Sequence, residues 1–217
     1  MRIAIAGAGN VGRAIARELL DNGHQVLLID KNPKAMKMQS VPDAEWLMAD
    51  ACEITSLDNA KLNNCQVLVA ATGDDKVNLV ASLLGKTEYG IPRVVARINH
   101  PKNEWLFDSS WGVDVAVSTP RIISALVEEA VSVGDVVRLF SFRKGQANLV
   151  ELTLPDTSSC IGKTVEEIEL PDNASLAAIV RDGQVIACSA HDVFAAGDEL
   201  LFVASAAAEA QIKACFI

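Results

Sequence analysis

Apolar runs and polar breaks alternate along the first 120 residues. Short apolar runs predict six strands, at Arg2–Ala6, Gln25–Ile29, Glu45–Met48, Gln66–Ala71, Arg93–Arg97 and Val113–Val117. Segments with helical spacing predict helices at Val11–Asp21 and Asp75–Tyr89, and Asn32-Pro33 opens a shorter helix, because proline is tolerated in a first helical turn. Six strands that alternate with helices predict an α/β fold with a Rossmann-like, doubly wound parallel sheet.

The pattern changes after Pro120. An amphipathic helix is predicted over Arg121–Val133, and its apolar side is Ile122, Ile123, Leu126, Val127 and Ala130. Periodicity does not identify what covers this side, so burial in its own domain and burial against another chain both stay open. Beyond Gly134, strands are predicted at Val136–Phe142, Ala147–Leu154, Leu176–Val180, Gln184–Cys188 and Glu199–Ala204, with short helices at Lys163–Glu169 and Ala206–Lys213. We therefore expect two domains, a nucleotide-binding domain over residues 1–134 and a small α+β C-terminal domain over residues 135–217.

Composition narrows the classes of partner. The chain has 217 residues and a formal net charge of -9. Lys and Arg form no run, which argues against a nucleic-acid partner and against an anionic membrane surface. No stretch approaches the roughly 20 apolar residues of a membrane span, so we expect a cytoplasmic protein. The five cysteines show no CxxC spacing, which favours neither a disulfide framework nor a metal site.

The strongest chemical signal is a glycine-rich turn after the first predicted strand. Gly7, Ala8, Gly9, Asn10, Val11 and Gly12 form the string GxGxxG. Gly7 permits a tight turn, Gly9 lets the backbone approach a diphosphate, and Gly12 lets the helix pack close to the strand. The helix N-terminus supplies free N–H groups and a positive dipole end for that diphosphate.

An acidic residue closes the second predicted strand at the spacing expected for this motif. Asp30 follows Gly12 by 18 residues, at a place where a carboxylate accepts hydrogen bonds from ribose hydroxyls and repels a 2′-phosphate. Lys31 follows directly, but we expect the carboxylate to dominate. A helix cap toward Pro33 is the alternative role for Asp30.

Further candidates follow later strands, at the carboxyl edge of the predicted sheet. Asp50 and Ala51 could meet an adenine edge, and Thr72 and Gly73 could flank the diphosphate. Asp75 is a further candidate, although Asp74 and Asp75 could instead cap the next helix. Arg97 could counter phosphate charge or form a salt bridge between elements.

Catalytic residues are scarce. The three histidines are His24, His100 and His191, and only His100 follows a strand at the expected edge of the sheet. A surface-loop role for His100 is the simpler interpretation. We therefore predict nucleotide binding without catalysis, with no catalytic residue, and a small NAD-dependent oxidoreductase or epimerase is the alternative. A redox-sensing repressor is disfavoured because the chain is acidic and no helix-turn-helix is predicted.

The motifs resemble a known family. The resemblance rests on the Gly7–Gly12 turn, Asp30, Asp50-Ala51, Thr72–Asn78, Lys86, Arg97 and the segment from Gly112 to Pro120. These residues resemble the RCK N-terminal domain of TrkA- and KtrA-type potassium-uptake subunits. Ile161–Val165, Leu170-Pro171, Ala178–Arg181 and Gly197–Leu200 resemble the TrkA-C domain that follows it.

The resemblance implies a function. Such subunits form cytoplasmic gating rings, typically octameric, beneath a TrkH- or KtrB-like membrane potassium channel, and nucleotides change the shape of the ring. It implies a regulatory subunit, peripheral on the inner face of the membrane, that assembles with itself from dimer to octamer or with a second RCK subunit. It also implies that the predicted helix Arg121–Val133 is the interdomain, dimer-forming crossover.

Two departures from the family bear on the nucleotide. ATP-responsive members carry an arginine within the glycine turn and an acidic residue after the proline of the sixth strand. Here Asn10 and Arg121 stand at those places. The resemblance therefore points to NAD(H) first, with ADP, AMP or ATP as further candidates. TrkA-type chains usually hold two tandem copies of the two-domain unit, whereas this sequence holds one.

Overall fold

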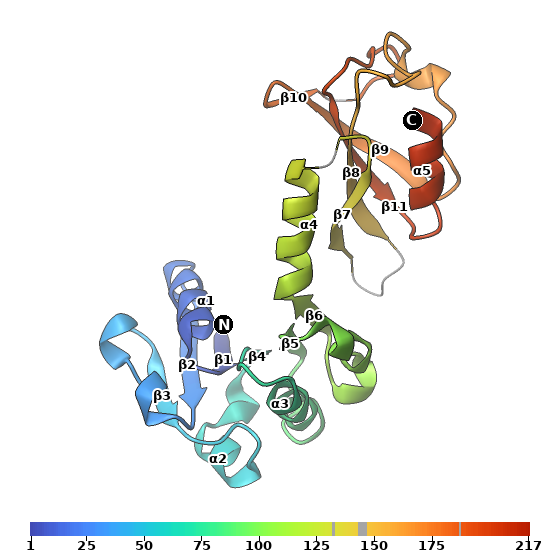
Figure 1. The fold of residues 1–217 in the computed structure, drawn as a ribbon. Coiled ribbons are helices and arrows are strands. Elements are labelled where there is room, and N and C mark those ends of the chain that lie inside the picture. The colour runs from blue at the N-terminus through green and yellow to red at the C-terminus, as the bar shows by residue number, and fades with distance from the viewer. Residues whose placement is uncertain (132, 143–146, 187) are drawn as a thin grey trace. The chain divides into compact units, whose positions relative to one another are not determined.

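The chain divides into two compact units, Met1–Pro120 and Arg121–Ile217 (Figure 1). A computed structural model describes residues 1–131, 133–142, 147–186 and 188–217. Ser132 in the predicted helix and Ala187 in a predicted strand lie outside the described residues. The predicted division into functional domains falls after residue 134 and assigns the helix predicted over Arg121–Val133 to the first domain. This assignment stays a prediction.

The first unit is built on one parallel sheet. Its strands are β1 (Arg2–Ala6), β2 (Gln25–Asp30), β3 (Glu45–Met48), β4 (Val67–Ala70), β5 (Arg93–Ile98) and β6 (Val115–Ser118). Its helices are α1 (Asn10–Asp21), α2 (Ile54–Asn59) and α3 (Asp75–Thr87), with 3-10 turns at Pro33–Ala35, Met38–Ser40, Leu62–Asn64, Pro101–Leu106 and Ser109–Trp111. The strand order is β3-β2-β1-β4-β5-β6 and every neighbouring pair is parallel. This confirms the predicted doubly wound sheet.

Alternation along the strands separates two apolar layers. Ile3 and Ile5 pack in a cluster with Ala16 of α1. Ala4 and Ala6 point to the other face and pack in a cluster that includes Leu57 of α2 and Leu79 of α3. Because neighbouring strands run parallel, the loops that follow them lie at one edge of the sheet, where ligands bind in such sheets.

The second unit is an antiparallel sheet with a helix against it. Its elements are α4 (Thr119–Val131), β7 (Val136–Ser141), β8 (Asn148–Thr153), β9 (Ala174–Arg181), β10 (Gln184–Ile186), β11 (Glu199–Ala204) and α5 (Glu209–Phe216), and α4 begins just before the division between the units. The strand order is β10-β9-β11-β8-β7. Phe194 and Phe202 each stack edge-on against Phe216 in the core, at centroid distances of 5.4 and 5.5 Å. The predicted small α+β domain is confirmed.

Short elements differ from the prediction. Helix α2 was not predicted, because it buries only Leu57 and so shows no apolar period. The predicted helix Lys163–Glu169 is a single 3-10 turn, Val165–Glu167, in which Thr164 and Glu167 form a capping box. Two 3-10 turns replace the short helix expected after Asn32-Pro33.

The helix after β6 carries exposed apolar side chains. Ile123, Leu126 and Val127 of α4 are 57%, 53% and 58% exposed, and Ile122 is 37% exposed. No core among the residues that the structure describes therefore covers these side chains. Among the described residues, no helix combines the length and apolarity needed to cross a membrane.

Candidate functional site

The glycine-rich turn has a different steric requirement at each glycine. Gly7 has φ +109, and a Cβ there would stand 2.9 Å from the carbonyl group of Ala71. A Cβ on Gly12 would stand 1.8 Å from the carbonyl oxygen of Gly7, so helix and turn could not approach as they do. Around Gly9 nothing lies within 4 Å of a Cβ position. The open space at Gly9 therefore fits a bound group that comes close to the backbone.

The start of α1 suits an anion. Gly9 is the N-cap residue, no side chain caps the helix in the described structure, and no acidic residue occupies its first turn. Gly9, Asn10 and Val11 are exposed, whereas Ala8 is buried. Uncapped N–H groups at a helix N-terminus bind phosphate oxygens readily.

Arg13 supports this turn and was missed by sequence reasoning. Its side chain is 8% exposed, and its guanidinium donates to the carbonyl oxygen of Ala8 and to Oδ1 of Asn10, the latter at 2.7 Å. Asn10 in the glycine-rich turn thus receives a hydrogen bond from an arginine one helical turn later. An arginine beside Gly12, on the buried side of the helix, is the signal that could have indicated this role.

Asp30 joins the end of β2 to the glycine turn. Its Oδ2 accepts a hydrogen bond from the backbone N–H of Ala8 at 2.8 Å, and its Oδ1 accepts one from Asn32 at 2.8 Å. An ionised carboxylate can accept about four hydrogen bonds, so capacity for ribose hydroxyls remains. The carboxylate predicted to bind ribose also holds the turn in position.

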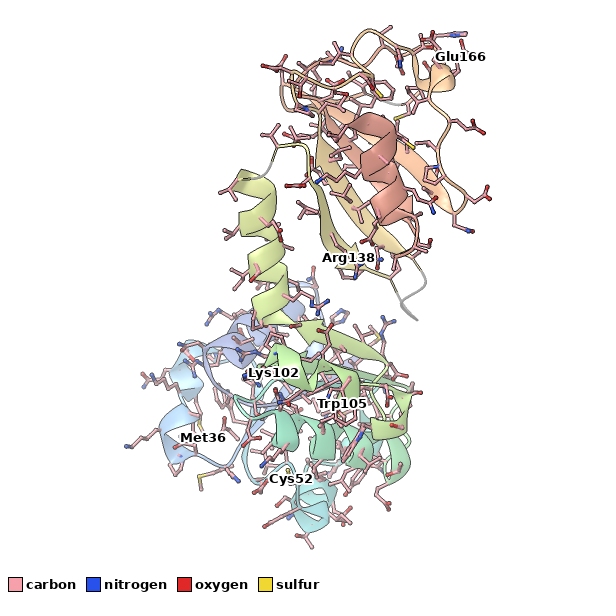
Figure 2. All side chains as sticks on the ribbon, turned by 45° about the vertical axis from the view of Figure 1, so that its right-hand side comes forward. Met36, Cys52, Lys102, Trp105, Arg138 and Glu166 are labelled. Carbon is pink, nitrogen blue, oxygen red and sulfur yellow. The ribbon has the colours of Figure 1, made fainter. Side chains whose placement is uncertain are left out.

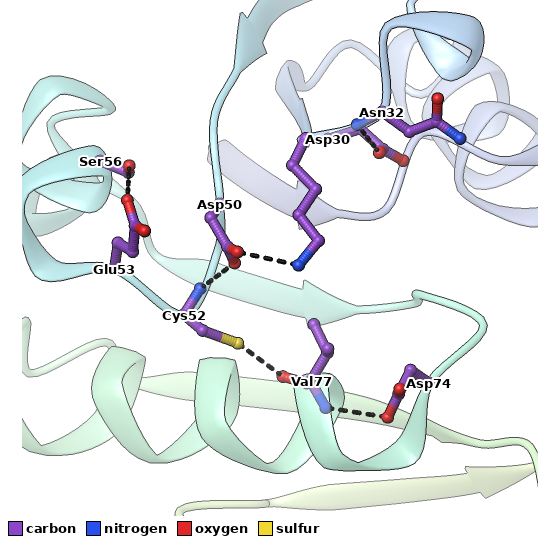
Figure 3. A network of polar contacts seen from close by, with 9 residues as sticks. Asp30, Asn32, Asp50, Cys52, Glu53, Ser56, Asp74 and Val77 are labelled. Atoms are coloured by element: carbon purple, nitrogen blue, oxygen red, sulfur yellow. Dashed lines mark hydrogen bonds and ion pairs between the residues drawn. The ribbon is translucent and has the colours of Figure 1, made fainter.

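Lys31, the residue after Asp30, forms an ion pair with Asp50. Figure 3 shows the polar contacts around Asp50. Lys31 Nζ lies 2.9 Å from Asp50 Oδ2, and Asp50 Oδ1 accepts a hydrogen bond from the N–H of Cys52 at 2.9 Å. The hydrogen bond from Cys52 and the contact with Lys31 lower the pKa of Asp50 below its ordinary value. Burial, followed by the Asp50 charge, raises the pKa of the Cys52 thiol.

These residues surround a pocket of about 240 Å³. The predicted residues that line it are Gly7, Asp30, Lys31, Asp50, Ala51 and Thr72. Ile29, Asn32, Ala49, Asp74 and Val77 complete the lining and were not among the predicted residues. A larger hollow of about 470 Å³ lies at the starts of β1, β2 and β3, where its lining includes Arg2, Gln25 and Glu45 and none of the predicted site residues.

Asn78 organises the turn after β4 and was not predicted as a site residue. It is fully buried. Its Oδ1 accepts from the N–H and the hydroxyl of Thr72 at 2.9 and 2.6 Å, and its Nδ2 donates to the carbonyl oxygen of Arg97 at 2.8 Å. Gly73 follows Thr72 in this turn, and Asp74 caps α3 by accepting from the N–H of Lys76 at 2.8 Å. The side chain of Asn78 therefore ties the predicted phosphate turn to β5.

Asp75 lies outside the pocket lining and holds the loop after β5. Its carboxylate accepts hydrogen bonds from the N–H groups of Asn99 and His100 at 2.6 and 3.0 Å and from the side chain of Asn103 at 2.8 Å. Burial raises the pKa of Asp75, but these hydrogen bonds outweigh it and lower the pKa overall. The nucleotide contact predicted for Asp75 stays a prediction.

The same loop contains the candidate catalytic histidine and an exposed tryptophan. His100 Nδ1 accepts from the N–H of Lys102 at 3.2 Å, so its ring caps the 3-10 turn that follows. Trp105 in this turn is 76% exposed (Figure 2). The structure thus provides a structural role for His100.

Arg97 lies at the end of β5 and outside the pocket lining. Its Nε is buried and has no hydrogen-bond partner in the described structure. No described residue forms a salt bridge with it, so the inter-element salt bridge considered for Arg97 is not seen. Its contact with phosphate stays a prediction.

Fold and site together define a Rossmann-type domain, with a pocket where its parallel strands end, followed by a small antiparallel domain. The model of the TrkA-N domain matches residues 3–119, and the model of the TrkA-C domain matches residues 149–216. The chain belongs to the TrkA family.

Relatives of known name cover nearly the whole chain. The "Trk system potassium uptake protein TrkA" of Mycobacterium tuberculosis is 54% identical over 213 residues, which cover 98% of this chain and 97% of the relative. The "Trk system potassium uptake protein TrkA homolog" of Methanothermobacter thermautotrophicus is 30% identical over 187 residues, with 86% and 85% covered.

Solved structures share the fold. "GsuK channel bound to NAD" superposes with a TM-score of 0.68 at 16% identity and covers 99% of this chain and 39% of that one. "Shewanella denitrificans Kef CTD in AMP bound form" has a TM-score of 0.53 at 22% identity and covers 60% of this chain and 80% of that one.

Proposed function

We propose that this chain is a nucleotide-sensing regulatory subunit of a potassium uptake system. The observation that carries the proposal is the 54% identity, over nearly the full length of both chains, to a protein named for Trk potassium uptake. The nucleotide acts as a signal rather than as a cofactor of catalysis. A ligand can move such a subunit between two shapes only if it binds them with different affinity.

An adenine nucleotide is the proposed ligand, with NAD(H) first and ADP, AMP or ATP as further candidates. The open space at Gly9, the uncapped start of α1 and the carboxylate of Asp30 support a ribose with an attached diphosphate. The named structures with NAD and AMP support the same ligand class. Thr72 and Gly73 complete the proposed diphosphate site, and Asp50 with Ala51 the proposed adenine site.

The proposed partners are copies of this chain and a membrane channel. The exposed apolar side of α4 supports assembly through this helix, from a dimer to an octameric gating ring, alone or with a second RCK subunit. The ring would lie on the inner face of the cell membrane, bound to a TrkH- or KtrB-like potassium channel subunit. The functional domains proposed for this role are residues 1–134 and 135–217.

A thermal-shift panel tests the proposal. The full chain is heated with NAD⁺, NADH, ATP, ADP, AMP or cyclic di-AMP, since a ligand that binds the folded state raises its apparent stability. We expect stabilisation by NAD(H) or a short adenine nucleotide, and its loss in Asp30→Ala. No stabilisation by any adenine nucleotide would contradict the proposal. Turnover of NADH that is lost in His100→Ala would favour the oxidoreductase alternative, and a monomer by light scattering would count against a ring.

A further inference from the structure

The charged side chains that line the pocket near Asp30 are mostly carboxylates, although a lysine follows Asp30 directly in the sequence. A lysine directly after Asp30 stands where a cation could bind a ribose 2′-phosphate. Among the described residues that line the pocket, Lys31 is the only cation, whereas Asp30, Asp50 and Asp74 carry carboxylates. The partner that holds Lys31 therefore decides whether its charge is available to a ligand.

Asp50 is the fixed member of the Lys31–Asp50 pair. Its side chain is 24% exposed, and one of its oxygens is held by the N–H of Cys52 at 2.9 Å (Figure 3). The side chain of Lys31 is 64% exposed and reaches the other oxygen at 2.9 Å. The hydrogen bond to Asp50 and the Asp50 charge raise the pKa of Lys31, so the ammonium stays charged at neutral pH.

We propose that Asp50 is a specificity-determining residue, which holds Lys31 away from the ribose 2′ position and so keeps the pocket selective for nucleotides with a free 2′-hydroxyl. The inference rests on the proposed function of this pocket. A 2′-phosphate would meet the carboxylate of Asp30 and would find the neighbouring ammonium already paired with Asp50. Without the Asp50 charge, Lys31 could form a charge-assisted hydrogen bond with that phosphate.

The test uses Asp50→Asn in the full chain. Asparagine keeps the shape of the side chain and an oxygen for the Cys52 N–H, but it removes the charge that holds Lys31. Calorimetry gives the dissociation constants for AMP against adenosine 2′,5′-bisphosphate and for NAD⁺ against NADP⁺. We expect the preference for the nucleotide without a 2′-phosphate to fall about tenfold or more, the effect of one charge-assisted hydrogen bond.

Two further variants separate release of Lys31 from a general change in charge. In the double variant Asp50→Asn, Lys31→Gln the gain for 2′-phosphorylated ligands should disappear. Asp74→Asn removes the same charge from the pocket without touching Lys31, and asparagine is also a good helix N-cap. We expect it to change the preference much less than Asp50→Asn does.

The outcomes distinguish this inference from the proposed function. If the wild-type chain binds AMP or NAD⁺ and Asp50→Asn leaves the preference unchanged, the specificity role is wrong and the proposed function stands. An equal effect of Asp74→Asn, or a gain that persists in the double variant, also overturns the specificity role. If the folded wild-type chain binds neither these four nucleotides nor NADH, ADP or ATP, both proposals are wrong.

Discussion

Replacement of Asn78 by alanine removes a fully buried amide that joins two loops of the proposed nucleotide site. The side chain accepts two hydrogen bonds from Thr72, and it donates to the carbonyl oxygens of Thr72 and Arg97 at 3.2 and 2.8 Å. The carbonyl of Thr72 keeps a second donor, the side chain of Asn99 at 3.0 Å. The N–H of Thr72 and the carbonyl of Arg97 lose this partner.

The expected cost follows from these two backbone groups. A buried polar group left without a partner costs about 1–3 kcal/mol, so the loss of partners for two groups should lower the free energy of unfolding of the first unit by roughly 2–6 kcal/mol. That is a large share of the roughly 5–15 kcal/mol by which a typical domain is stable. The turn at Thr72 should also lose its fixed position, which would weaken nucleotide binding.

Tryptophan fluorescence reports this unit selectively. The three tryptophans of the chain, Trp46, Trp105 and Trp111, all lie within Met1–Pro120. At a urea slope of about 2 kcal/mol per M, the middle of the usual range, the unfolding midpoint of Asn78→Ala should fall by roughly 1–3 M. Calorimetry with AMP or NAD⁺ measures the loss of affinity.

Ser82→Ala is the matched control. Ser82 is also buried on α3, and its hydroxyl donates to the carbonyl oxygen of Asn78 at 2.7 Å, a local bond within the helix. We expect this variant to cost no more than about 1 kcal/mol and to bind normally. The reasoning is refuted if Asn78→Ala unfolds at the wild-type midpoint, or if Ser82→Ala is destabilised as strongly.

Further expectations concern other parts of the chain. Gly12→Ala should abolish nucleotide binding in calorimetry, because its Cβ would stand 1.8 Å from a carbonyl oxygen. Gly9→Ala should keep the wild-type unfolding midpoint and lose only affinity, because nothing lies within 4 Å of its Cβ position. Equal destabilisation of both variants would contradict this expectation. Burial and the hydrogen bond to Asp58 raise the pKa of Tyr89 to about 12, so this single tyrosine should ionise near pH 12 by absorbance, and nearer its ordinary value in Asp58→Asn. Because the pKa of Tyr89 is raised in the folded state, its contribution to stability is complete below about pH 10 and is lost as the pH rises toward 12; ionisation near pH 10 in the folded wild type would contradict the burial argument. Asp198 is fully buried and pairs with Arg181 at 2.6 Å, so Asp198→Asn should destabilise the second unit by roughly 3 kcal/mol. The measurement is amide hydrogen exchange, which should become faster in β9 and β11. Unchanged exchange would show that the ion pair contributes little to stability.

Much of the first unit could be predicted because its signals are local. Buried parallel strands appear as apolar runs, and glycine at three positions of one turn reflects steric limits that act within a few residues. The glycine turn and Asp30 therefore pointed to one edge of the sheet, and the structure brings them together there. Helix α2 was missed, and the turn at Val165–Glu167 was predicted as a longer helix, because elements of one or two turns show no reliable hydrophobic period.

The sequence alone determined the parallel α/β fold and the two-part organisation, and it indicated the residues that we propose to bind phosphate and ribose. Only the tertiary structure decided how polar side chains share their partners: Arg13 on the glycine turn, Asn78 between two loops, and Asp50 on Lys31. Asp50 and Lys31 are far apart in sequence and meet because parallel strands β2 and β3 end at the same edge. Strand and turn formation depends on neighbours along the chain, whereas the charge and hydrogen-bond state of each site residue depends on which loops the sheet order places side by side.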